Sequence, residues 1–340
     1  MAHDMNETIA ALTAPGKGLL AADESTGTIE KRFKALDIPC TEDTRRRYRE
    51  MLFTTHGLGE FISGVILFEE TLRQKADDGR PLPQVLIEQG IVPGIKVDKG
   101  TVALAHFPGD KLTQGLDGLA ARLAEYQPLG ARFAKWRAVF TITDETPSAQ
   151  AIELNADALA LYAAYCQQQS IVPIVEPEVL MDGDHTIERC AYVTQEVLAA
   201  VFHALHRQRV VLEHMLLKPS MVIAGKDCAH QAAPSEVADY TLRCFRRTVP
   251  AAVPSINFLS GGQRDEAASA NLNAMHGAGL ALPWNVSFSY SRALQSLPMA
   301  TWKGNAANRS AAQLALYRRA RLNSLAQQGR YASALEAQAA

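Results

Sequence analysis

Eight short apolar segments recur along the chain, and stretches with helical periodicity separate most of them. Apolar runs of about four to eight residues bounded by turn residues are typical of buried β-strands. Several of these runs are continuous, as expected for parallel strands that are buried on both faces. The segments are GLLAAD (18–23), SGVILF (63–68), VPGIKV (92–97), ARFAKWR (131–137), IVPIVEP (171–177), VVLEHMLLKP (210–219), SINFLS (255–260) and NVSFS (285–289).

Eight strands that alternate with helices predict an α/β fold, and a TIM (β/α)8 barrel matches the count better than an open sheet. No stretch is rich enough in glycine, proline or serine to divide the chain, so we expect a single barrel domain over residues 1–340. The segment after Gln327 is small and polar, and a mobile tail is expected over about 328–340.

Periodicity and capping residues predict several of the helices. Residues 116–127 and 184–207 both have helical spacing of apolar side chains. Ser310 with Gln313 predicts a capping box at the start of a late helix. The basic run 45–49 follows Thr41, a suitable helix cap, and a solvent-exposed helix is the favoured interpretation of that run, with a partner contact as the alternative.

The composition limits the kinds of partner and cofactor. With 34 basic and 36 acidic residues and a net charge of −2, the chain is not expected to bind nucleic acid or an acidic membrane. It has neither an apolar run of the ~18 residues that span a bilayer nor a signal-peptide pattern. Its five scattered cysteines predict neither a zinc site nor disulfides, and a cytoplasmic location fits. His203 and His206 share a helix face that we expect to be exposed, so no metal or other cofactor is predicted.

Charged residues fall repeatedly at the carboxyl ends of the candidate strands. In a barrel those ends form the mouth, where catalytic side chains gather. A single case is most simply a strand ending in solvent or a buried ion pair, but the repetition favours one shared pocket. The residues are Asp23, Lys96, Lys135, Arg137, Glu176, Glu178 and Lys218.

Lysines and carboxylates in one pocket suit Schiff-base chemistry. An amine attacks a carbonyl only when it is deprotonated, and a free lysine with a pKa of ~10.4 is almost wholly protonated at neutral pH. Burial and neighbouring cations disfavour the ammonium form. Lys218 follows the apolar run HMLL, and Lys96 and Lys135 are candidates for the neighbouring charge. Carboxylates would then move protons during carbinolamine dehydration and cleavage.

Two groups of residues are candidate phosphate sites. Ser260-Gly261-Gly262 follows one of the last strands, where backbone N–H groups can form an anion nest, and Ser289 and Arg292 end the next strand. A lone SGG is usually just a turn, so the signal rests on the combination. Near the N-terminus, Ser25, Thr28, Lys31 and Arg32 are candidates for a second phosphate at the other end of the substrate.

Nine segments of the chain resemble, in order, the blocks of class I fructose-1,6-bisphosphate aldolases. The resemblance runs from about Ala14 to about Tyr331 and implies a TIM barrel, usually a homotetramer, that acts on sugar phosphates in glycolysis and gluconeogenesis. The segments are LLAADESTGTIEKR, QKADDGRPLPQ, GIKVDKG, TQGLDGL, FAKWR, IVPIVEPE, LLKPSM, FLSGGQ and FSYSR.

The resemblance implies catalytic roles at five positions. Lys218 would form the Schiff base, and Glu176 would be the acid and base for carbinolamine dehydration, assisted by Glu178 and Lys135. Asp23 would accept the proton of the C4 hydroxyl during C3–C4 cleavage. Nine further residues would contact the substrate: Arg137 and Lys96 orient it; Ser260, Gly261, Ser289, Ser291 and Arg292 bind the C1 phosphate; and Ser25 and Thr28, with Lys96, lie toward the C6 phosphate.

The chain departs from the family pattern at three places. Ser291 stands in FSYSR where the family has glycine, so a side chain needs room and the backbone a less permissive φ. The vertebrate enzymes end in a tyrosine that exchanges the enamine proton, whereas this chain ends in alanine, and Tyr331 or Glu178 is a candidate for that role. Thr28 replaces a serine and keeps its hydroxyl.

Three other interpretations compete with this one. A Schiff-base barrel acting on sedoheptulose bisphosphate or fructose 1-phosphate would share the catalytic core and differ at the distal phosphate. A binding protein that has lost catalysis would be expected to lack Lys218 or Glu176, and both are present. A metal-dependent aldolase would need a histidine cluster that the sequence does not suggest.

Overall fold

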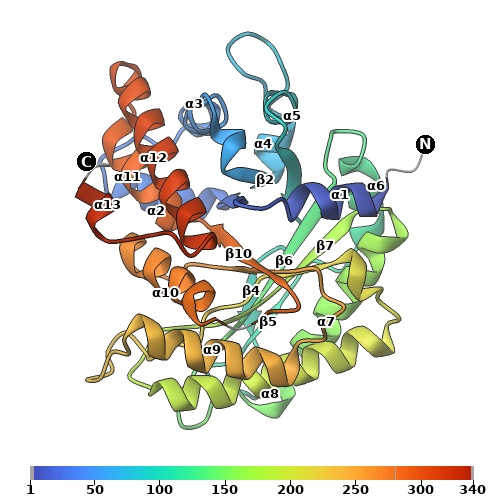
Figure 1. Cartoon of the computed structure of the whole chain (residues 1–340). Helices are drawn as coiled ribbons and strands as arrows, with labels where there is room; N and C mark the ends of the chain where they lie inside the picture. Colours follow the sequence, from blue (N-terminus) through green and yellow to red (C-terminus); the bar gives the residue numbers. More distant parts are fainter. Residues whose placement is uncertain (1–3, 280, 338–340) are drawn as a thin grey trace.

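The computed structural model describes residues 4–279 and 281–337 and is built around a closed barrel of parallel strands (Figure 1). The strands follow the spatial order β1-β10-β9-β8-β7-β6-β3-β2, and β1 pairs with both β2 and β10 to close the ring. The predicted TIM barrel is therefore confirmed. The eight strands are β1 (Gly18–Ala22), β2 (Ile62–Leu67), β3 (Val92–Lys96), β6 (Phe133–Phe140), β7 (Val172–Val179), β8 (Leu216–Leu217), β9 (Ser255–Phe258) and β10 (Asn285–Tyr290).

Each of the eight apolar segments overlaps one barrel strand, but the segment 210–219 is mostly not a strand. Only Leu216–Leu217 joins the barrel as β8, and a one-turn 3₁₀ helix, η2 (Leu212–His214), precedes it. Val210 and Leu212 still pack against the core from this turn. Val211 and Glu213 are exposed, so apolar content located the strand correctly but predicted it to be longer and more buried than it is.

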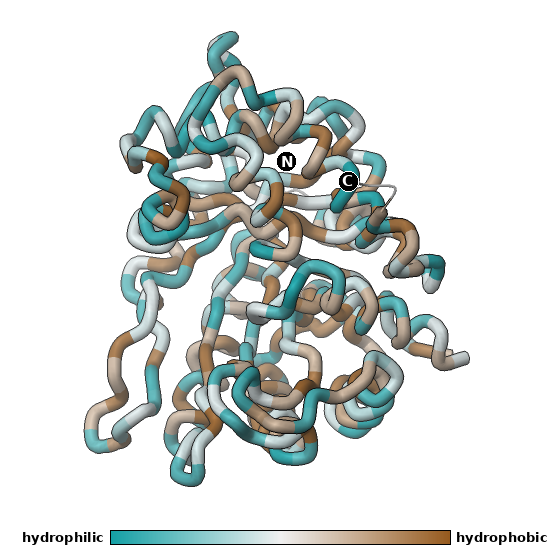
Figure 2. The backbone as a smooth tube through the Cα atoms, turned by 90° about the vertical axis from the view of Figure 1, so that its left-hand side faces the viewer, coloured by the Kyte–Doolittle hydropathy of each residue, from teal (hydrophilic) through white to brown (hydrophobic). Residues whose placement is uncertain are grey.

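Helices surround the barrel, and α10 and α12 pack against β10 (Figure 1). In Figure 2 the tube alternates between hydrophilic and hydrophobic colours along the outer helices, which have one face toward the barrel and one toward solvent. The helices are α1 (Met5–Leu12), α2 (Thr26–Lys34), α3 (Glu42–Phe53), α4 (Glu69–Arg73), α5 (Leu82–Ile87), α6 (Leu119–Tyr126), α7 (Ala149–Gln168), α8 (Ile187–Arg207), α9 (Pro234–Thr248), α10 (Asp265–Gly277), α11 (Arg292–Trp302), α12 (Arg309–Gln327), α13 (Ala334–Ala337) and the 3₁₀ helices η1 (Leu58–Glu60) and η3 (Ala306–Asn308).

A small apolar cluster fills the interior of the barrel away from its mouth. Leu19, Ile66, Phe133 and Ile174, from four different strands, are all fully buried in it. Met5 and Ile9 of α1 pack against the same cluster, so the first helix covers the amino ends of the strands. The barrel is thereby closed at one end, and polar side chains can gather only at the other.

Two predicted helices are confirmed, but the predicted capping box is wrong. Helices α6 and α8 lie within the ranges 116–127 and 184–207, and His203 and His206 on α8 are exposed as expected. Helix α12 already includes Ser310, which makes no cap. Gln313 instead donates hydrogen bonds to the carbonyl oxygen of Met51 and to Thr54 Oγ1 on the adjoining helix. Tertiary contacts thus use a side chain that local sequence assigned to capping.

The basic run 45–49 lies on α3 and is not a solvent-exposed face. Thr41 caps this helix as predicted, since its Oγ1 accepts from the N–H of Thr44. Arg49, however, is 3% exposed and its guanidinium lies 2.6 Å from Glu24 Oε2. Tyr48 is fully buried. Three of the arginines therefore form ion pairs with acidic residues from distant segments: Arg45 with Glu70, Arg46 with Asp77 and Arg49 with Glu24.

The segment after Gln327 folds back onto the barrel helices in its described part. The ring hydroxyl of Tyr331 donates to Glu336, and Arg319 of α12 holds the same carboxylate at 2.7 Å. Tyr331 is 9% exposed. Mobility of the tail stays a prediction, and residues 338–340 lie outside the described part.

A two-stranded antiparallel hairpin that the sequence did not indicate lies between β3 and α6. It consists of β4 (Thr101–Ala103) and β5 (Lys111–Thr113). Asn155 of α7 fixes it by accepting from the N–H of Thr113 and donating to the carbonyl oxygen of Lys111. Across the described residues, no helix is both long and apolar enough to cross a membrane.

Candidate active site

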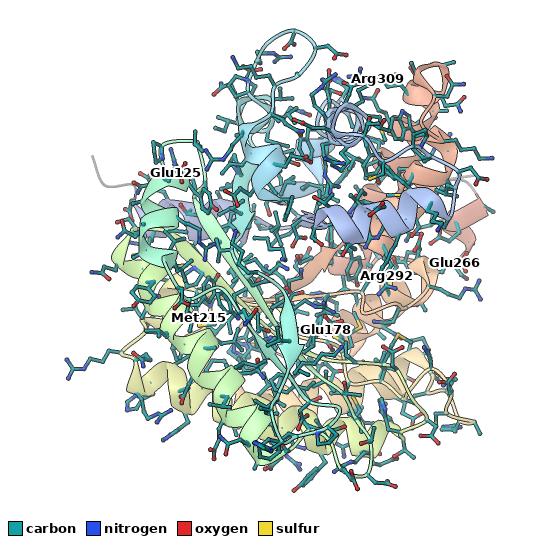
Figure 3. All side chains as sticks on the ribbon, turned by 180° about the vertical axis from the view of Figure 1, so that it is seen from behind. Glu125, Glu178, Met215, Glu266, Arg292 and Arg309 are labelled. Atoms are coloured by element: carbon teal, nitrogen blue, oxygen red, sulfur yellow. The ribbon has the colours of Figure 1, made fainter. Side chains whose placement is uncertain are left out.

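Near the barrel mouth, charged side chains occupy the inward-facing positions of the strands, which apolar side chains occupy further inside. Side chains alternate between the two faces of a strand, so positions two apart share a face. On β7, Val172 and Ile174 belong to the interior cluster, and Glu176 and Glu178 follow at the same spacing. In Figure 3, Glu178 accordingly lies at the centre of the molecule, whereas Glu125 and Arg309 lie at its edge.

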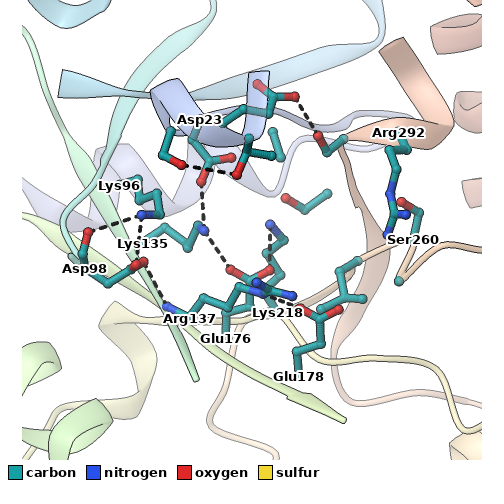
Figure 4. A pocket seen from close by; sticks show the side chains of 18 of the residues that line it. Asp23, Lys96, Asp98, Lys135, Arg137, Glu176, Glu178, Lys218, Ser260 and Arg292 are labelled. Atoms are coloured by element: carbon teal, nitrogen blue, oxygen red, sulfur yellow. Dashed lines mark hydrogen bonds and ion pairs between the residues drawn. The ribbon is translucent and has the colours of Figure 1, made fainter. Parts of the chain in front are cut away.

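Four of these charged groups form a continuous ion-pair chain at the centre of the mouth (Figure 4). Lys218 Nζ lies 3.0 Å from Glu176 Oε1, and Lys135 Nζ lies 3.0 Å from the other oxygen of that carboxylate. Lys135 Nζ also lies 2.7 Å from Asp23 Oδ2. All four residues are at most 8% exposed. Two amines and two carboxylates from four different strands are thus held within contact distance.

Burial and neighbouring charges have opposite effects on the pKa values of the groups in this ion-pair chain. Burial raises the pKa of Asp23, but the positive charges of Lys135, Lys218 and Lys96 outweigh it and hold the pKa well below its usual value. Burial lowers the pKa of Lys135, but Asp23 and Glu176 outweigh it and keep the pKa above its usual value. Asp23 is therefore an ionised carboxylate and Lys135 a fixed cation at neutral pH.

Two further ion pairs flank the chain on the side of β3 and β6. Lys96 Nζ lies 2.8 Å from Asp98 Oδ1, and the N–H of Arg137 donates to Asp98 Oδ2 at 3.3 Å. The guanidinium of Arg137 is paired with Glu178. Burial lowers the pKa of Arg137, and Glu178 more than reverses this effect. These pairs orient Lys96 and Arg137 toward the cavity (Figure 4).

The opposite side of the mouth offers donors for an anion. Gly261 and Gly262 have φ of +60° and +100°, which only glycine adopts freely, and they shape the turn after Ser260. The hydroxyl of Ser289 is buried without a partner among the described residues. Arg292 opens helix α11, whose positive end faces the same space. Such an arrangement is typical of phosphate binding.

Residues at the start of α2 line one side of the cavity. Arg32 of this helix does not lie where the sequence placed it. Ser25 Oγ and Thr28 Oγ1 are 3.1 Å apart at the start of α2. Arg32, which was expected with them at a separate second phosphate, donates to Ser291 Oγ at 3.2 Å and is paired with Glu24. Arg32 therefore lies at the end of the cavity that holds Arg292, because it stands one helical turn after Thr28 on α2 and contacts Ser291, which precedes Arg292.

The fourteen residues to which the sequence assigned a catalytic or substrate-binding role all line one cavity of about 490 Å³. Seven lysine or arginine side chains and five carboxylates line it, an excess of positive charge that suits an anionic substrate. The fourteen are Asp23, Ser25, Thr28, Lys96, Lys135, Arg137, Glu176, Glu178, Lys218, Ser260, Gly261, Ser289, Ser291 and Arg292.

Sequence reasoning missed two carboxylates of the cavity, Glu24 and Asp98. Each stands next to a residue that was singled out, directly after Asp23 or two positions after Lys96, and that neighbourhood was the available signal. Tyr331, a candidate for enamine proton exchange, is not among the residues that line the cavity, and its hydroxyl is bound to Glu336.

Fold and site together define an enzyme of the (β/α)8-barrel class that handles a phosphorylated small molecule. A family model described as fructose-bisphosphate aldolase class-I matches residues 4–340. A probable fructose-bisphosphate aldolase class 1 from Xanthomonas campestris pv. campestris is 55% identical over 330 residues, which cover 97% of this chain and 98% of that protein. A similarly named protein from Xylella fastidiosa strain Temecula1 is 53% identical over 333 residues, with the same coverage of both chains.

Solved structures agree with these sequence comparisons. The fructose-bisphosphate aldolase from Plasmodium falciparum, crystallised with TRAP and a small-molecule inhibitor, superposes with a TM-score of 0.95 at 50% identity and covers 97% of this chain and 95% of its own. The chain belongs to the class-I fructose-bisphosphate aldolase family. The predicted family and reaction are thereby confirmed: reversible, metal-independent cleavage of fructose 1,6-bisphosphate to dihydroxyacetone phosphate and glyceraldehyde 3-phosphate.

Proposed function

We propose that Lys218 is the residue of this chain that forms the Schiff base with the ketose substrate. The observation that carries the proposal is the buried pair of Lys218 Nζ and Glu176 Oε1 at 3.0 Å, at the mouth of the barrel. A nucleophilic amine needs an adjacent group that accepts its proton, and Glu176 is in contact with it. Lys135 is committed to two carboxylates and is already a fixed cation.

Glu176 is proposed to move the protons of Schiff-base formation. The Lys218 amine adds to the C2 carbonyl and gives a carbinolamine, and Glu176 then protonates the departing hydroxyl so that water leaves and an iminium remains. Lys135, at 3.0 Å from the other oxygen of Glu176, stabilises the carboxylate that this step leaves behind. Glu178 is paired with Arg137, which fits an assisting role.

Asp23 is proposed to be the base for cleavage of the C3–C4 bond. Asp23 takes the proton of the C4 hydroxyl, and C4 with its oxygen becomes the aldehyde group of the product. The electron pair of the C3–C4 bond moves into the iminium and forms an enamine. Its lowered pKa keeps the carboxylate ionised and ready to accept a proton. Protonation of the enamine at C3 and hydrolysis then release dihydroxyacetone phosphate from Lys218.

The two ends of the cavity are proposed to hold the two phosphates. Ser260, Gly261, Ser289 and Arg292, with the backbone N–H of Ser291, provide the donors for the C1 phosphate. The C6 phosphate is assigned to the side of the cavity formed by Ser25, Thr28 and Lys96, and Arg137 orients the chain of carbons between the two ends.

Borohydride trapping with dihydroxyacetone phosphate tests the assignment of the nucleophile. The reaction is run in the presence of EDTA and followed by peptide mass mapping. An adduct on Lys218 is expected. An adduct on Lys135 or Lys96, or cleavage without any adduct, would overturn the proposal. Lys226, an exposed lysine in the loop after the same strand, serves as the internal control for nonspecific modification.

The cellular setting and assembly are also proposed from the family. We infer a single-domain enzyme of the cytoplasm, acting in glycolysis and gluconeogenesis as a homotetramer. All five cysteines are free, which fits a reducing compartment. Light scattering of the purified chain tests the tetramer, and a monomeric mass at micromolar concentration would contradict it.

A further inference from the structure

The hydroxyl of Ser291, at the position where the family has glycine, is bound inside a charged network. Ser291 Oγ donates to Glu24 Oε1 at 2.9 Å and accepts from Nη1 and Nη2 of Arg32 at 3.2 and 3.3 Å. The backbone at Ser291 has φ −103°, outside the left-handed region, so the side chain is accommodated without the expected strain. A glycine could make neither of these side-chain contacts.

The network is anchored on its inner side by buried groups. Glu24 is 7% exposed, and its second oxygen lies 2.6 Å from the buried guanidinium of Arg49. Gln295, fully buried on α11, donates to Glu24 Oε1 at 2.8 Å and to Ser291 Oγ at 3.2 Å. Buried groups thus hold the carboxylate of Glu24 in one position. A side chain that contacts both Glu24 and Ser291 is therefore held in place as well.

Arg32 is the outer member of the network and faces the cavity. Its side chain is 22% exposed and lines the cavity together with Ser289 and Arg292. Because Arg49 already offsets the charge of Glu24, the positive charge of Arg32 remains available to an anion. Arg292 has no ion pair within the described residues. Burial lowers the pKa of Arg292, and the positive charge of Arg32 lowers it further. Two guanidinium groups therefore face one space, and the one carboxylate paired with Arg32, that of Glu24, is shared with Arg49.

We propose that Ser291 is a positioning residue that fixes the guanidinium of Arg32 toward the substrate phosphate bound at Arg292. An arginine held in one orientation loses less conformational entropy when an anion binds. The inference rests on the proposed function, since it assigns Arg32 to the C1 end of the same substrate. The effect enters through phosphate binding and leaves the chemistry at Lys218 unchanged.

Steady-state cleavage of fructose 1,6-bisphosphate and inhibition by inorganic phosphate test this role. Ser291→Ala and Ser291→Gly are expected to raise the KM and the phosphate inhibition constant about threefold to tenfold, as for the loss of one hydrogen bond to a charged group, while kcat changes less than twofold. Ser296→Ala is the matched control on α11, because the hydroxyl of Ser296 donates only to the backbone oxygen of Arg292.

A double-variant cycle separates positioning from a merely structural effect. In an Arg32→Met background, Ser291→Ala should change neither constant further, because Ser291 acts through Arg32. Unchanged constants in both Ser291 variants, or effects that add in the double variant, would overturn the inference. Borohydride trapping of each variant runs in parallel. Failure to trap Lys218 in the wild-type protein overturns the proposed function, whereas normal trapping with unchanged constants overturns the positioning role alone.

Discussion

Lys218 Nζ and Glu176 Oε1 lie 3.0 Å apart although they come from neighbouring strands 42 residues apart in the chain. Both side chains point into the barrel because their strands are in parallel register, with Val175 paired to Leu217. The amine and the carboxylate that is proposed to accept its proton are therefore positioned by main-chain hydrogen bonds of the barrel. Groups that are carried by barrel strands are placed more precisely than groups on loops, which favours precise proton transfer.

Replacing the proposed nucleophile should abolish cleavage. We expect Lys218→Ala to lower kcat/KM for fructose 1,6-bisphosphate by at least about a thousandfold, since no other amine can form the covalent intermediate. A coupled assay for glyceraldehyde 3-phosphate measures the loss, with Lys226→Ala as the control lysine variant. Turnover within tenfold of wild type in Lys218→Ala would reject the assignment.

Replacing Asp23 should separate adduct formation from cleavage. Asp23→Ala is expected to form the Schiff base with dihydroxyacetone phosphate but to cleave the bisphosphate about a hundredfold to ten-thousandfold more slowly, because the base for the C4 hydroxyl is missing. Intact mass after borohydride reduction and single-turnover cleavage measure the two steps. If the variant forms no adduct, Asp23 acts in the first step and its role here is wrong.

Removing the inner arginine of the Glu24 network should destabilise the fold. Arg49→Met leaves the buried carboxylate of Glu24 without one of its two ion pairs, and breaking a buried pair costs about 3–5 kcal/mol. Urea denaturation should show this loss in the free energy of unfolding. Arg47→Met, on the same helix but half-buried, should cost under about 1 kcal/mol. Equal effects of the two variants would contradict the importance of the network.

A glycine of β3 should not tolerate even a methyl group. A Cβ atom added at Gly94 would lie 2.2 Å from the buried ring of Phe133, so Gly94→Ala is expected to cost about 1–3 kcal/mol through overpacking. Gly27→Ala, where nothing lies within 4 Å of an added Cβ, is the matched control and should be neutral or slightly stabilising. Thermal unfolding compares the two variants, and a Gly94→Ala protein as stable as wild type would mean that Phe133 moves aside.

Stability should fall below neutral pH partly through His276. Burial lowers the pKa of His276 from its ordinary value of 6.5, and a hydrogen bond to the Val286 carbonyl only partly offsets this. The unfolded chain then binds more protons than the folded one as the pH drops below about 6.5, so the stability present at neutral pH is lost as the pH falls toward the lowered value.

The His276 contribution can be isolated by substitution. His276→Gln should reduce the loss in the free energy of unfolding between pH 7 and 5.5, by less than about 1.4 kcal/mol per pH unit. His203→Gln, at an exposed position, should leave the slope unchanged. A slope that is equally steep in the wild type and in His276→Gln would show that other groups control the acid response.

The barrel could be predicted from the sequence because its signals are local. Each strand is an apolar run, and each reactive side chain stands at the end of such a run, so Lys218, Lys135 and Glu176 could be found one segment at a time. Their shared cavity followed from the rule that the carboxyl ends of barrel strands meet.

Features that depend on contacts between distant segments could not be predicted in this way. The burial of Arg49 requires Glu24, and the position of Arg32 requires Ser291, a partner 259 residues away in the chain. Gln313 was assigned to a cap because its true partners, Met51 and Thr54, belong to another helix. Sequence patterns describe a residue and its neighbours, whereas these side chains respond to charge and space supplied by the fold.

The pairing of β1 with β10 has a consequence for the order in which the enzyme becomes active. Asp23 and Glu24 are synthesised more than 260 residues before Ser289, Ser291 and Arg292. The residues that line the cavity are not all in place until β10 pairs with β1. A nascent chain that already carries Lys218 therefore lacks the residues proposed to bind phosphate, and the proposed nucleophile has its complete cavity only after the ring is closed.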